Sequence, residues 1–380
     1  MQTTKTLDEK QQIPMANPQP DTVPLDGNDA RVRLAGSACL PQRTPLSACR
    51  ACADSCPVSA LTVTAGTGPQ LMGDCTGCGA CASACPSEAL LVDGFPDAEG
   101  PTPAQPPVRS IECHRVPAAL TRADTLRVPC MAGLNEADML ALAHAAGPGG
   151  LTLMDRDWCD GCPARGNWTS TPVDDAQRRA NHHLAGSSTP PVTVTRAPLP
   201  DDVASPVAHG PELRRGNSRR QLLQLFSPEP KTTKPNAVET HGNADPRQRI
   251  TPHRRLRLLE ARRLVAAPTP SPAPRLEIDG NCCNTGICSA LCPTAALTRT
   301  RAGDGLEFEP ELCISCGLCA TVCPQQAITI HAEGGTRGRL TDHRQATCRD
   351  CGRTFSPASD GTTHCEACEK SQGLGRAAFM

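Results

Sequence analysis

The sequence predicts an α+β protein assembled from several small metal-binding modules. Three observations lead to this expectation. The 380 residues include 24 cysteines, most of them in closely spaced groups. Only 2% of the residues are aromatic, with no tyrosine, and 38 are prolines. This composition offers little material for one large apolar core, whereas bound metal supplies folding free energy to small modules.

The cysteines are expected to be thiolate metal ligands in a cytoplasmic protein. Disulfide scaffolds this rich in cysteine are short secreted chains with a signal peptide. Here the first twenty residues are polar and lack a signal-peptide pattern, and the chain has no apolar run of about 18 residues for a membrane span. The formal net charge of -1 gives no signal for binding nucleic acid or a membrane surface.

Two runs share one spacing, C-x2-C-x2-C-x3-C-P. The first is CTGCGACASACP, with Cys75, Cys78, Cys81 and Cys85, and the second is CISCGLCATVCP, with Cys313, Cys316, Cys319 and Cys323. Three thiolates on one tight loop cap three irons of a cubane cluster, and the fourth cysteine reaches a second cluster. Glycines in these loops allow the backbone to wrap closely and to point N–H groups at sulfur.

Each intact run has an altered partner upstream. The first partner ends in C-x2-C-x3-C-P, with a seven-residue insertion behind its first cysteine, and contains Cys39, Cys49, Cys52 and Cys56. The second keeps the C-x3-C-P end behind two adjacent cysteines and contains Cys282, Cys283, Cys288 and Cys292. Short apolar runs, expected to be strands, follow all four motifs. The departures leave the roles of Cys39, Cys282 and Cys283 open, with a three-iron cluster as one alternative.

These motifs resemble bacterial ferredoxins that hold two [4Fe–4S] clusters, present here in two copies. The resemblance implies four [4Fe–4S] clusters with exchanged ligands. Cys85 then joins Cys39, Cys49 and Cys52, while Cys56 joins Cys75, Cys78 and Cys81. In the same way Cys292 joins Cys313, Cys316 and Cys319, and Cys323 joins the upstream cluster.

The tail carries a further cysteine quartet with C-x2-C-x13-C-x2-C spacing. Its members are Cys348, Cys351, Cys365 and Cys368. Two such knuckles joined by a hairpin give a tetrahedral four-sulfur site, which suits zinc in a zinc ribbon. A mononuclear iron has the same geometry and is the alternative.

The four remaining cysteines also form a quartet. Cys113, Cys130 and Cys159 each come after an apolar run, and Cys162 completes a CxxC pair. The segment NEADMLALAHAAG, residues 135–147, has helical periodicity and a glycine stop. A strand, helix, strand order predicts a parallel unit, and side chains at the carboxyl ends of its strands meet at one sheet edge.

Residues 128–163 resemble the small iron–sulfur (delta) subunit of the methyl-viologen-reducing hydrogenase type. That subunit has a strand ending in a cysteine, a glycine turn, a helix, and a strand leading to a second cysteine pair. The resemblance implies a [2Fe–2S] cluster that passes electrons between a hydrogenase and heterodisulfide reductase. A lone Cys113 departs from the cysteine-rich entry of the family, so zinc stays an alternative.

The expected order of modules follows from these motifs. A polar N-terminus without fixed structure (1–30) precedes a ferredoxin-type dicluster domain (31–98) and a small α/β iron–sulfur domain (105–170). A Pro/Arg-rich linker (171–274) with short helices at 218–226 and 254–267 leads to a second dicluster domain (275–332) and the zinc ribbon (340–370). For the basic linker we expect a solvated helix face with Leu256, Leu259 and Leu264 packed inward; a docking surface for an acidic partner or RNA is the alternative.

The function predicted from these modules is multi-cluster electron transfer. Four cubanes in one chain suggest a relay between redox partner proteins, by analogy the catalytic subunits of a hydrogenase or a formate dehydrogenase-like oxidoreductase. No catalytic residues are visible, so the chain is not predicted to be an enzyme by itself. Alternatives are thiol or disulfide chemistry at Cys159, and a regulatory or assembly protein that senses redox state and binds a partner or nucleic acid. The ribbon lacks a dense basic or aromatic face, which argues against nucleic acid.

Overall fold

The computed structural model describes residues 22–25, 32–95, 107–166, 168–199, 248–267, 273–357, 362–365 and 367–371. Helices and strands are both present, as the predicted α+β class requires. The helix expected at 218–226 lies outside the described residues. Among the described helices, none has the length and apolar character needed to cross a membrane.

The N-terminal dicluster module, so named for the two clusters that we expect in it, pairs its first and last strands. Strand β2 forms antiparallel pairs with β1 and β5, and β3 and β4 form a hairpin. The pairing of β1 differs from the expectation that residues 1–30 lack structure, because its backbone hydrogen-bonds to the free edge of β2. The elements are β1 (Thr22–Pro24), β2 (Val32–Ala35), α1 (Leu40–Arg43), α2 (Ala51–Asp54), β3 (Leu61–Thr64), β4 (Gly68–Leu71), α3 (Ala80–Ala84) and β5 (Leu90–Val92).

The middle domain contains a four-stranded parallel sheet in the order β7-β6-β8-β9. Helices α4 and α5 pack on it and share its apolar core. The predicted helix at 135–147 is confirmed: Asn135 caps α4 at its start and Gly147 ends it. The sheet continues past residue 170, where we expected the linker, since β9 pairs with β8. The elements are β6 (Ser110–Cys113), β7 (Thr125–Val128), η2 (Met131–Gly133), α4 (Glu136–Ala146), β8 (Thr152–Asp155), α5 (Pro172–Leu184) and β9 (Thr193–Arg196).

The C-terminal dicluster module repeats the plan of the N-terminal one. Its first and last strands, β10 and β13, pair antiparallel, and β11 and β12 form a hairpin to which β14 is added. The tail that follows contains the hairpin of β15 and β16. The elements are β10 (Arg275–Ile278), α8 (Ile287–Ala290), β11 (Leu297–Arg299), β12 (Leu306–Phe308), η6 (Pro310–Leu312), α9 (Leu318–Thr321), β13 (Ile328–His331), β14 (Gly338–Arg339), β15 (Ala346–Thr347) and β16 (Thr354–Phe355).

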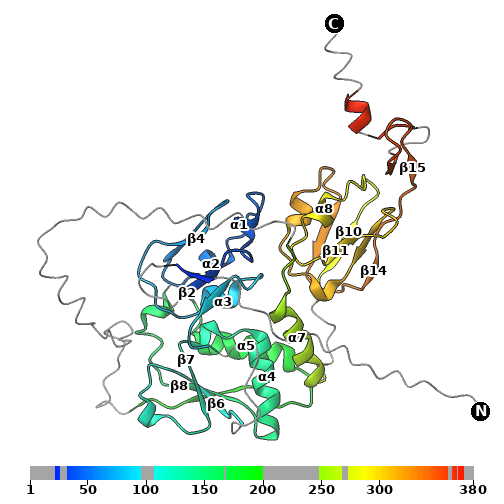
Figure 1. The fold of residues 1–380 in the computed structure, drawn as a ribbon. Helices are drawn as coiled ribbons and strands as arrows, with labels where there is room; N and C mark the ends of the chain where they lie inside the picture. The colour runs from blue at the N-terminus through cyan, green and yellow to red at the C-terminus, as the bar shows by residue number, and fades with distance from the viewer. Residues whose placement is uncertain are drawn as a thin grey trace, which may run out of the picture.

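One helix from the expected linker, α7 (His253–Leu264), packs against the middle domain. Figure 1 shows it between that domain and the C-terminal dicluster module. Ala261 and Val265 are buried in the apolar core of the middle domain, whereas Leu264 is 49% exposed. The inward face that we expected is therefore wrong at Leu264, and the small residues Ala261 and Val265 take that place.

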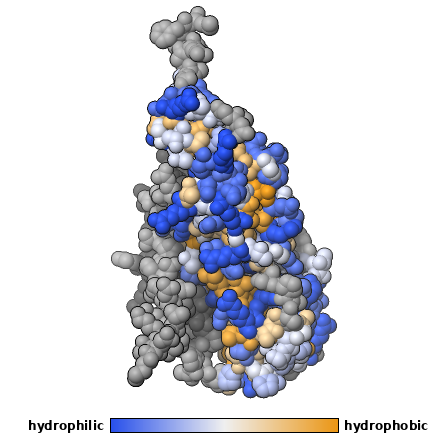
Figure 2. Space-filling view, turned by 90° about the vertical axis from the view of Figure 1, so that its right-hand side faces the viewer, coloured by the Kyte–Doolittle hydropathy of each residue, from blue (hydrophilic) through white to orange (hydrophobic). Residues whose placement is uncertain are grey.

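One face of the molecule carries both apolar and hydrophilic residues. The face in Figure 2 shows small apolar patches between hydrophilic ones. The large exposed apolar side chains of the described residues are distributed over all three modules and α7, and they are Leu46, Met72, Leu120, Leu264 and Ile287. Isolated apolar residues of this kind are normal on a folded surface and mark no binding face by themselves.

Candidate iron–sulfur and metal sites

Site I is the set of Cys39, Cys49, Cys52 and Cys85. Their thiols line a single apolar cavity in the N-terminal module. Burial raises the pKa of Cys39 to about 12, and the nearby charges of Cys85, Cys52 and Cys49 add to that rise. The inserted residues behind Cys39 form helix α1, so the displaced cysteine still reaches the other three. The structure thus brings together the four residues that the ferredoxin resemblance implies.

Site II is the set of Cys56, Cys75, Cys78 and Cys81. Burial raises the pKa of Cys81, with added contributions from the other three thiols and from Cys52 of site I. The two sites are therefore neighbours through Cys52 and Cys81. This grouping also follows the exchanged ligand pattern that the resemblance implies.

All four motifs share one turn that aims a backbone N–H group at sulfur. The third residue after each Cys-Pro cysteine has a positive φ between 51° and 58°, and these residues are Ser59, Glu88, Ala295 and Gln326. Three of these turns are followed by an N–H donated to the cysteine sulfur at 3.3 Å, from Ala60 to Cys56, from Ala89 to Cys85 and from Ala327 to Cys323. In the fourth, Leu297 donates to Cys292 at 3.5 Å. Such N–H groups stabilise the negative charge of a cluster's thiolates.

The middle site is the set of Cys113, Cys130, Cys159 and Cys162. Strand β6 ends at Cys113, Cys130 comes two residues after β7, and the loop after β8 carries the CxxC pair. All four thiols line one cavity at the carboxyl edge of the parallel sheet. Burial raises the pKa of Cys159 to about 12, and the charges of Asp155, Cys113 and Cys162 add to this effect.

The cavity of the middle site also contains the thiol of Cys78, a member of site II. Burial raises the pKa of Cys130 well above its usual range, and Cys78 is the neighbouring charge that adds most to this rise. The backbones approach closely here, because a Cβ on Gly79 would lie 3.0 Å from the Cα of Gly133. Gly79 also has a φ of +77°, which favours glycine. Site II and the middle site are therefore contiguous.

A buried ion pair lies next to the middle site. Glu112, which precedes Cys113, is 1% exposed and accepts a hydrogen bond from Arg156 at 2.5 Å. Arg156 also donates to the carbonyl of Ala197 at 3.0 Å, just after β9. The pair thus ties the cysteine-bearing strand β6 to the sheet edge formed by β8 and β9.

Site IV is the set of Cys292, Cys313, Cys316 and Cys319 in the C-terminal module. Burial raises the pKa of Cys316 to about 11 and that of Cys319 to about 12. The charge of Cys292 adds to the rise at both residues. The exchanged ligand, Cys292, thus lies beside the intact run as the resemblance implies.

Site III is the set of Cys282, Cys288 and Cys323. Burial raises the pKa of Cys288 to about 11, and the charges of Cys282 and Cys323 add to the effect. Cys283 contributes to the pKa rise of Cys282, but its own side chain is exposed. The structure therefore brings three of the predicted cysteines together in site III and leaves the side chain of Cys283 exposed to solvent.

Thr285 takes the backbone position in site III that Cys316 has in site IV. Asn284 and Ser315, which precede these two residues, have φ values of 50° and 53°. The glycine that follows has a φ of 75° in both loops. The sequence contained the signal, since C-x2-T-x2-C-x3-C differs from the intact run at this one residue, but the adjacent Cys283 concealed it.

The tail site consists of Cys348, Cys351, Cys365 and Cys368, whose sulfur atoms all lie within 4.8 Å of one another. The N–H groups of Cys351 and Cys365 lower the pKa of Cys348 to about 6. The hydrogen bond from Cys365 reaches the Cys348 sulfur at 3.3 Å. Four sulfurs at this separation fit a single tetrahedral ion.

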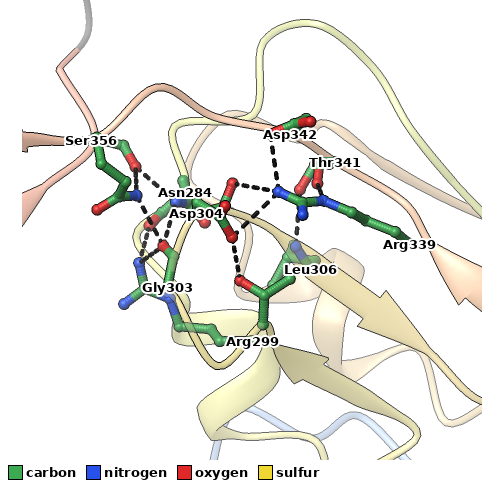
Figure 3. A network of polar contacts seen from close by, with 11 residues as sticks. Asn284, Arg299, Gly303, Asp304, Leu306, Arg339, Thr341, Asp342 and Ser356 are labelled. Atoms are coloured by element: carbon green, nitrogen blue, oxygen red, sulfur yellow. Dashed lines mark hydrogen bonds and ion pairs between the residues drawn. The ribbon is translucent and has the colours of Figure 1, made fainter.

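The tail contacts the loop of site III. Asn284 donates hydrogen bonds to Ser356 at 2.7 Å and to the carbonyl of Gly303 at 3.0 Å. Figure 3 shows these contacts continuing through Asp304 to Arg339. The tail is thus fixed beside the loop in which a threonine replaces a cysteine.

Comparison with known protein families identifies two segments of this chain. Residues 72–91 and 306–329 match the 4Fe–4S binding domain. Among curated proteins no match is found. No solved structure matches either.

The geometry and the family match agree on the class of protein. The two matched segments contain the intact cysteine runs of sites II and IV. Buried thiols and N–H groups directed at sulfur fit the needs of a [4Fe–4S] cluster. The chain is an iron–sulfur protein with ferredoxin-type 4Fe–4S binding domains, and electron transfer is the function that these domains support.

Proposed function

We propose that the chain is an electron relay with four cubane clusters at sites I to IV, a further cluster at the middle site and zinc at the tail site. The observation that carries the proposal is the single cavity shared by Cys78 of site II and the four middle-site thiols. Contiguous redox sites suit a relay, because one electron passes between them with little rearrangement.

The relay requires a donor and an acceptor, which we propose to be redox partner proteins. The resemblance of the middle domain to the hydrogenase delta subunit favours catalytic subunits of a hydrogenase or a formate dehydrogenase-like oxidoreductase. In this proposal the middle site and site III are the two ends. The middle-site cavity is bordered by Arg115, Arg156 and Trp158, and the loop of site III has exposed residues.

A [2Fe–2S] cluster at the middle site fits four thiols in one apolar cavity, and zinc is its alternative. Catalysis by a Cys159 thiol fits less well. Burial raises the pKa of that thiol to about 12, whereas a reactive cysteine needs a lowered pKa.

Metal analysis and spectroscopy on protein purified without oxygen test this proposal. We expect about 18 iron atoms and about one zinc per chain, with EPR signals that appear on stepwise dithionite reduction and disappear on reoxidation. About 16 iron atoms with about two zincs would make the middle site structural and remove one end of the relay.

A regulatory or assembly role is the second candidate, and the exposed Thr285 position of site III is the observation that favours it. A sensor changes its cluster occupancy, whereas a relay cycles without loss. Repeated reduction and reoxidation with unchanged iron content supports the relay. Progressive loss of iron from all sites would support the sensor.

A further inference from the structure

We propose that residues 248–265 form a clamp that holds the two dicluster modules together through their cysteine loops, so that electrons pass between site I and site IV. The proposal rests on the proposed relay for its functional part only. The clamp consists of Gln248–Ile250 and helix α7, which we expected to be a solvated basic linker.

Two arginines of the clamp bind equivalent turns in the two modules. Arg254 donates to three carbonyl groups around helix α3, those of Ala82, Ser83 and Cys85, at 2.8, 2.7 and 3.1 Å. Arg249 does the same around helix α8, where it donates to the carbonyls of Ser289, Ala290 and Cys292. Each set ends at a cysteine that belongs to an exchanged ligand pair, Cys85 of site I and Cys292 of site IV.

Residues Gln248–Ile250, just before α7, also hydrogen-bond to both dicluster modules. In the N-terminal module Arg43, four residues after Cys39, donates to the carbonyl of Gln248. Two residues later the N–H of Ile250 donates to the carbonyl of Pro293 at 2.7 Å. A segment of three residues therefore contacts the loops of both site I and site IV.

Arg255 extends the attachment to a second member of site IV. Helix α7 packs against η6, which directly precedes Cys313. The guanidinium of Arg255 interacts electrostatically with Cys313, and its buried Nε and Nη2 atoms have no hydrogen-bond partner among the described residues. Glu311 is a second negative charge near this guanidinium, and the negative charge of an occupied site IV would add to the stabilisation of Arg255. Arg254 and Arg255 are adjacent, yet Arg254 donates to the carbonyl of Cys85 in site I and Arg255 interacts electrostatically with Cys313 of site IV.

The rest of α7 is anchored in the middle domain. Arg257 pairs with the 8%-exposed Asp138 at 2.8 Å, and Arg262 lies 2.7 Å from Nδ1 of the buried His183. Ala261 and Val265 complete the apolar core there. The clamp therefore contacts three modules, and Figure 1 shows α7 at their junction.

The proposed step is a transfer of one electron and involves no bond or proton. Site I loses the electron and site IV gains it, or the reverse, and the redox partner proteins act as external reductant and oxidant. The positive charge of Arg255 favours the more negative, reduced state of site IV, because nearby charge sets the potential of an iron–sulfur cluster.

Cleavage of the intact protein tests the clamp without reference to electron transfer. A recognition site for a sequence-specific protease is inserted after residue 225, and the purified holoprotein is cut. We expect the two fragments to co-elute on size exclusion, since Arg254 and Arg257 of one fragment bind the other. The double substitution Arg254→Ala and Arg257→Ala should raise the dissociation constant of the fragments at least about tenfold.

The matched control is Arg263→Ala, which changes an arginine of the same helix whose side chain is 76% exposed. This variant should co-elute as tightly as the cleaved parent protein. Separation of the parent fragments, or equal affinity of the double variant and the control, would overturn the proposal. Either result leaves the metal content and reversible reduction unaffected, so it is distinct from failure of the relay.

A redox titration monitored by EPR tests the role of Arg255. Arg255→Gln should lower the reduction potential of one C-terminal cluster, whereas Arg263→Gln should not. Arg255→Lys should restore part of the change, since it keeps the charge. Equal potentials in all three variants would overturn the placement of Arg255 beside site IV.

Discussion

In the N-terminal dicluster module site II shares a cavity with the middle domain, whereas in the C-terminal module the loop of site III has exposed residues and contacts the tail. In both modules the first and last strands pair and a hairpin lies between them, although β1 is added to β2 in one and β14 to β12 in the other, and the turns after each Cys-Pro are the same. The same kind of cysteine loop therefore occurs in two different environments, one packed against the middle domain and one beside the tail. Its own backbone positions the thiols, and the residues around it decide which other part of the chain the loop contacts.

The largest expected difference between the modules concerns Cys81→Ala and Cys319→Ala. Each removes an equivalent ligand and should cost about four iron atoms per chain. Only Cys81→Ala should also alter the spectrum of the middle site, because the loop of Cys78 forms part of that cavity. Iron analysis with EPR measures both effects. Equal changes at the middle site would contradict the shared cavity.

The middle domain should depend strongly on its buried ion pair. Arg156→Met leaves Glu112 buried without a partner and should reduce the free energy of unfolding of this domain by about 3–5 kcal/mol. Denaturant unfolding followed by loss of the middle-site absorption gives the measurement. The matched change Arg122→Met removes a pair in which the arginine is 74% exposed, and it should cost at most about 1 kcal/mol. Similar losses in the two variants would contradict the burial of Glu112.

Site III should differ from site I in its stability toward air. With Thr285 in place of a cysteine, we expect site III to lose about one iron on brief exposure and to show the EPR signal of a three-iron cluster. Thr285→Cys should suppress this signal, and Cys49→Thr should create it in the N-terminal module. Cys283→Ala is the control and should leave the signal unchanged. A parent protein that lacks the signal, together with its appearance in Cys283→Ala, would instead assign the fourth ligand role to Cys283.

The smallest expected effect is the pH dependence of metal binding at the tail site. Hydrogen bonding to neighbouring thiols raises the pKa of Cys368 to about 12, so this thiol is protonated at neutral pH and must lose its proton when zinc binds. Cys348, with its pKa lowered to about 6, is already a thiolate above that pH. Zinc affinity should therefore rise with pH between 6 and 9, and it should fall more steeply below about 6, where Cys348 also gains a proton. A competition titration with a chromogenic chelator measures this, and a pH-independent affinity would count against the four-thiol site.

Much of the local structure could be predicted from the sequence. The spacing of the intact runs, the short apolar strands after each motif and helix α4 depend on residues close together in the chain, so their patterns are visible there. The grouping of Cys113 and Cys130 with the CxxC pair followed from the topology of a parallel sheet. Thr285 was equally visible but was missed, because two adjacent cysteines suggested a different register.

Other features depend on contacts between distant segments. Arginines are spread along helix α7, and leucines are its largest apolar residues. The sequence therefore predicted that Leu264 is buried, whereas the structure buries Ala261. The partners of this helix are backbone carbonyls of Ala82 and Ser83 and the side chain of Asp138, and no local pattern shows such partners. The shared cavity of site II and the middle site likewise appears only when the two domains are packed together.

The most direct test of the relay is the EPR spectrum of the fully reduced protein, compared with that of Cys130→Ser. Because site II and the middle site share a cavity, we predict signals broadened by magnetic interaction between two reduced clusters. Cys130→Ser should remove the middle-site signal and leave a narrower spectrum from site II. Independent, unbroadened signals in the unmodified protein, or a middle site without iron, would contradict the account.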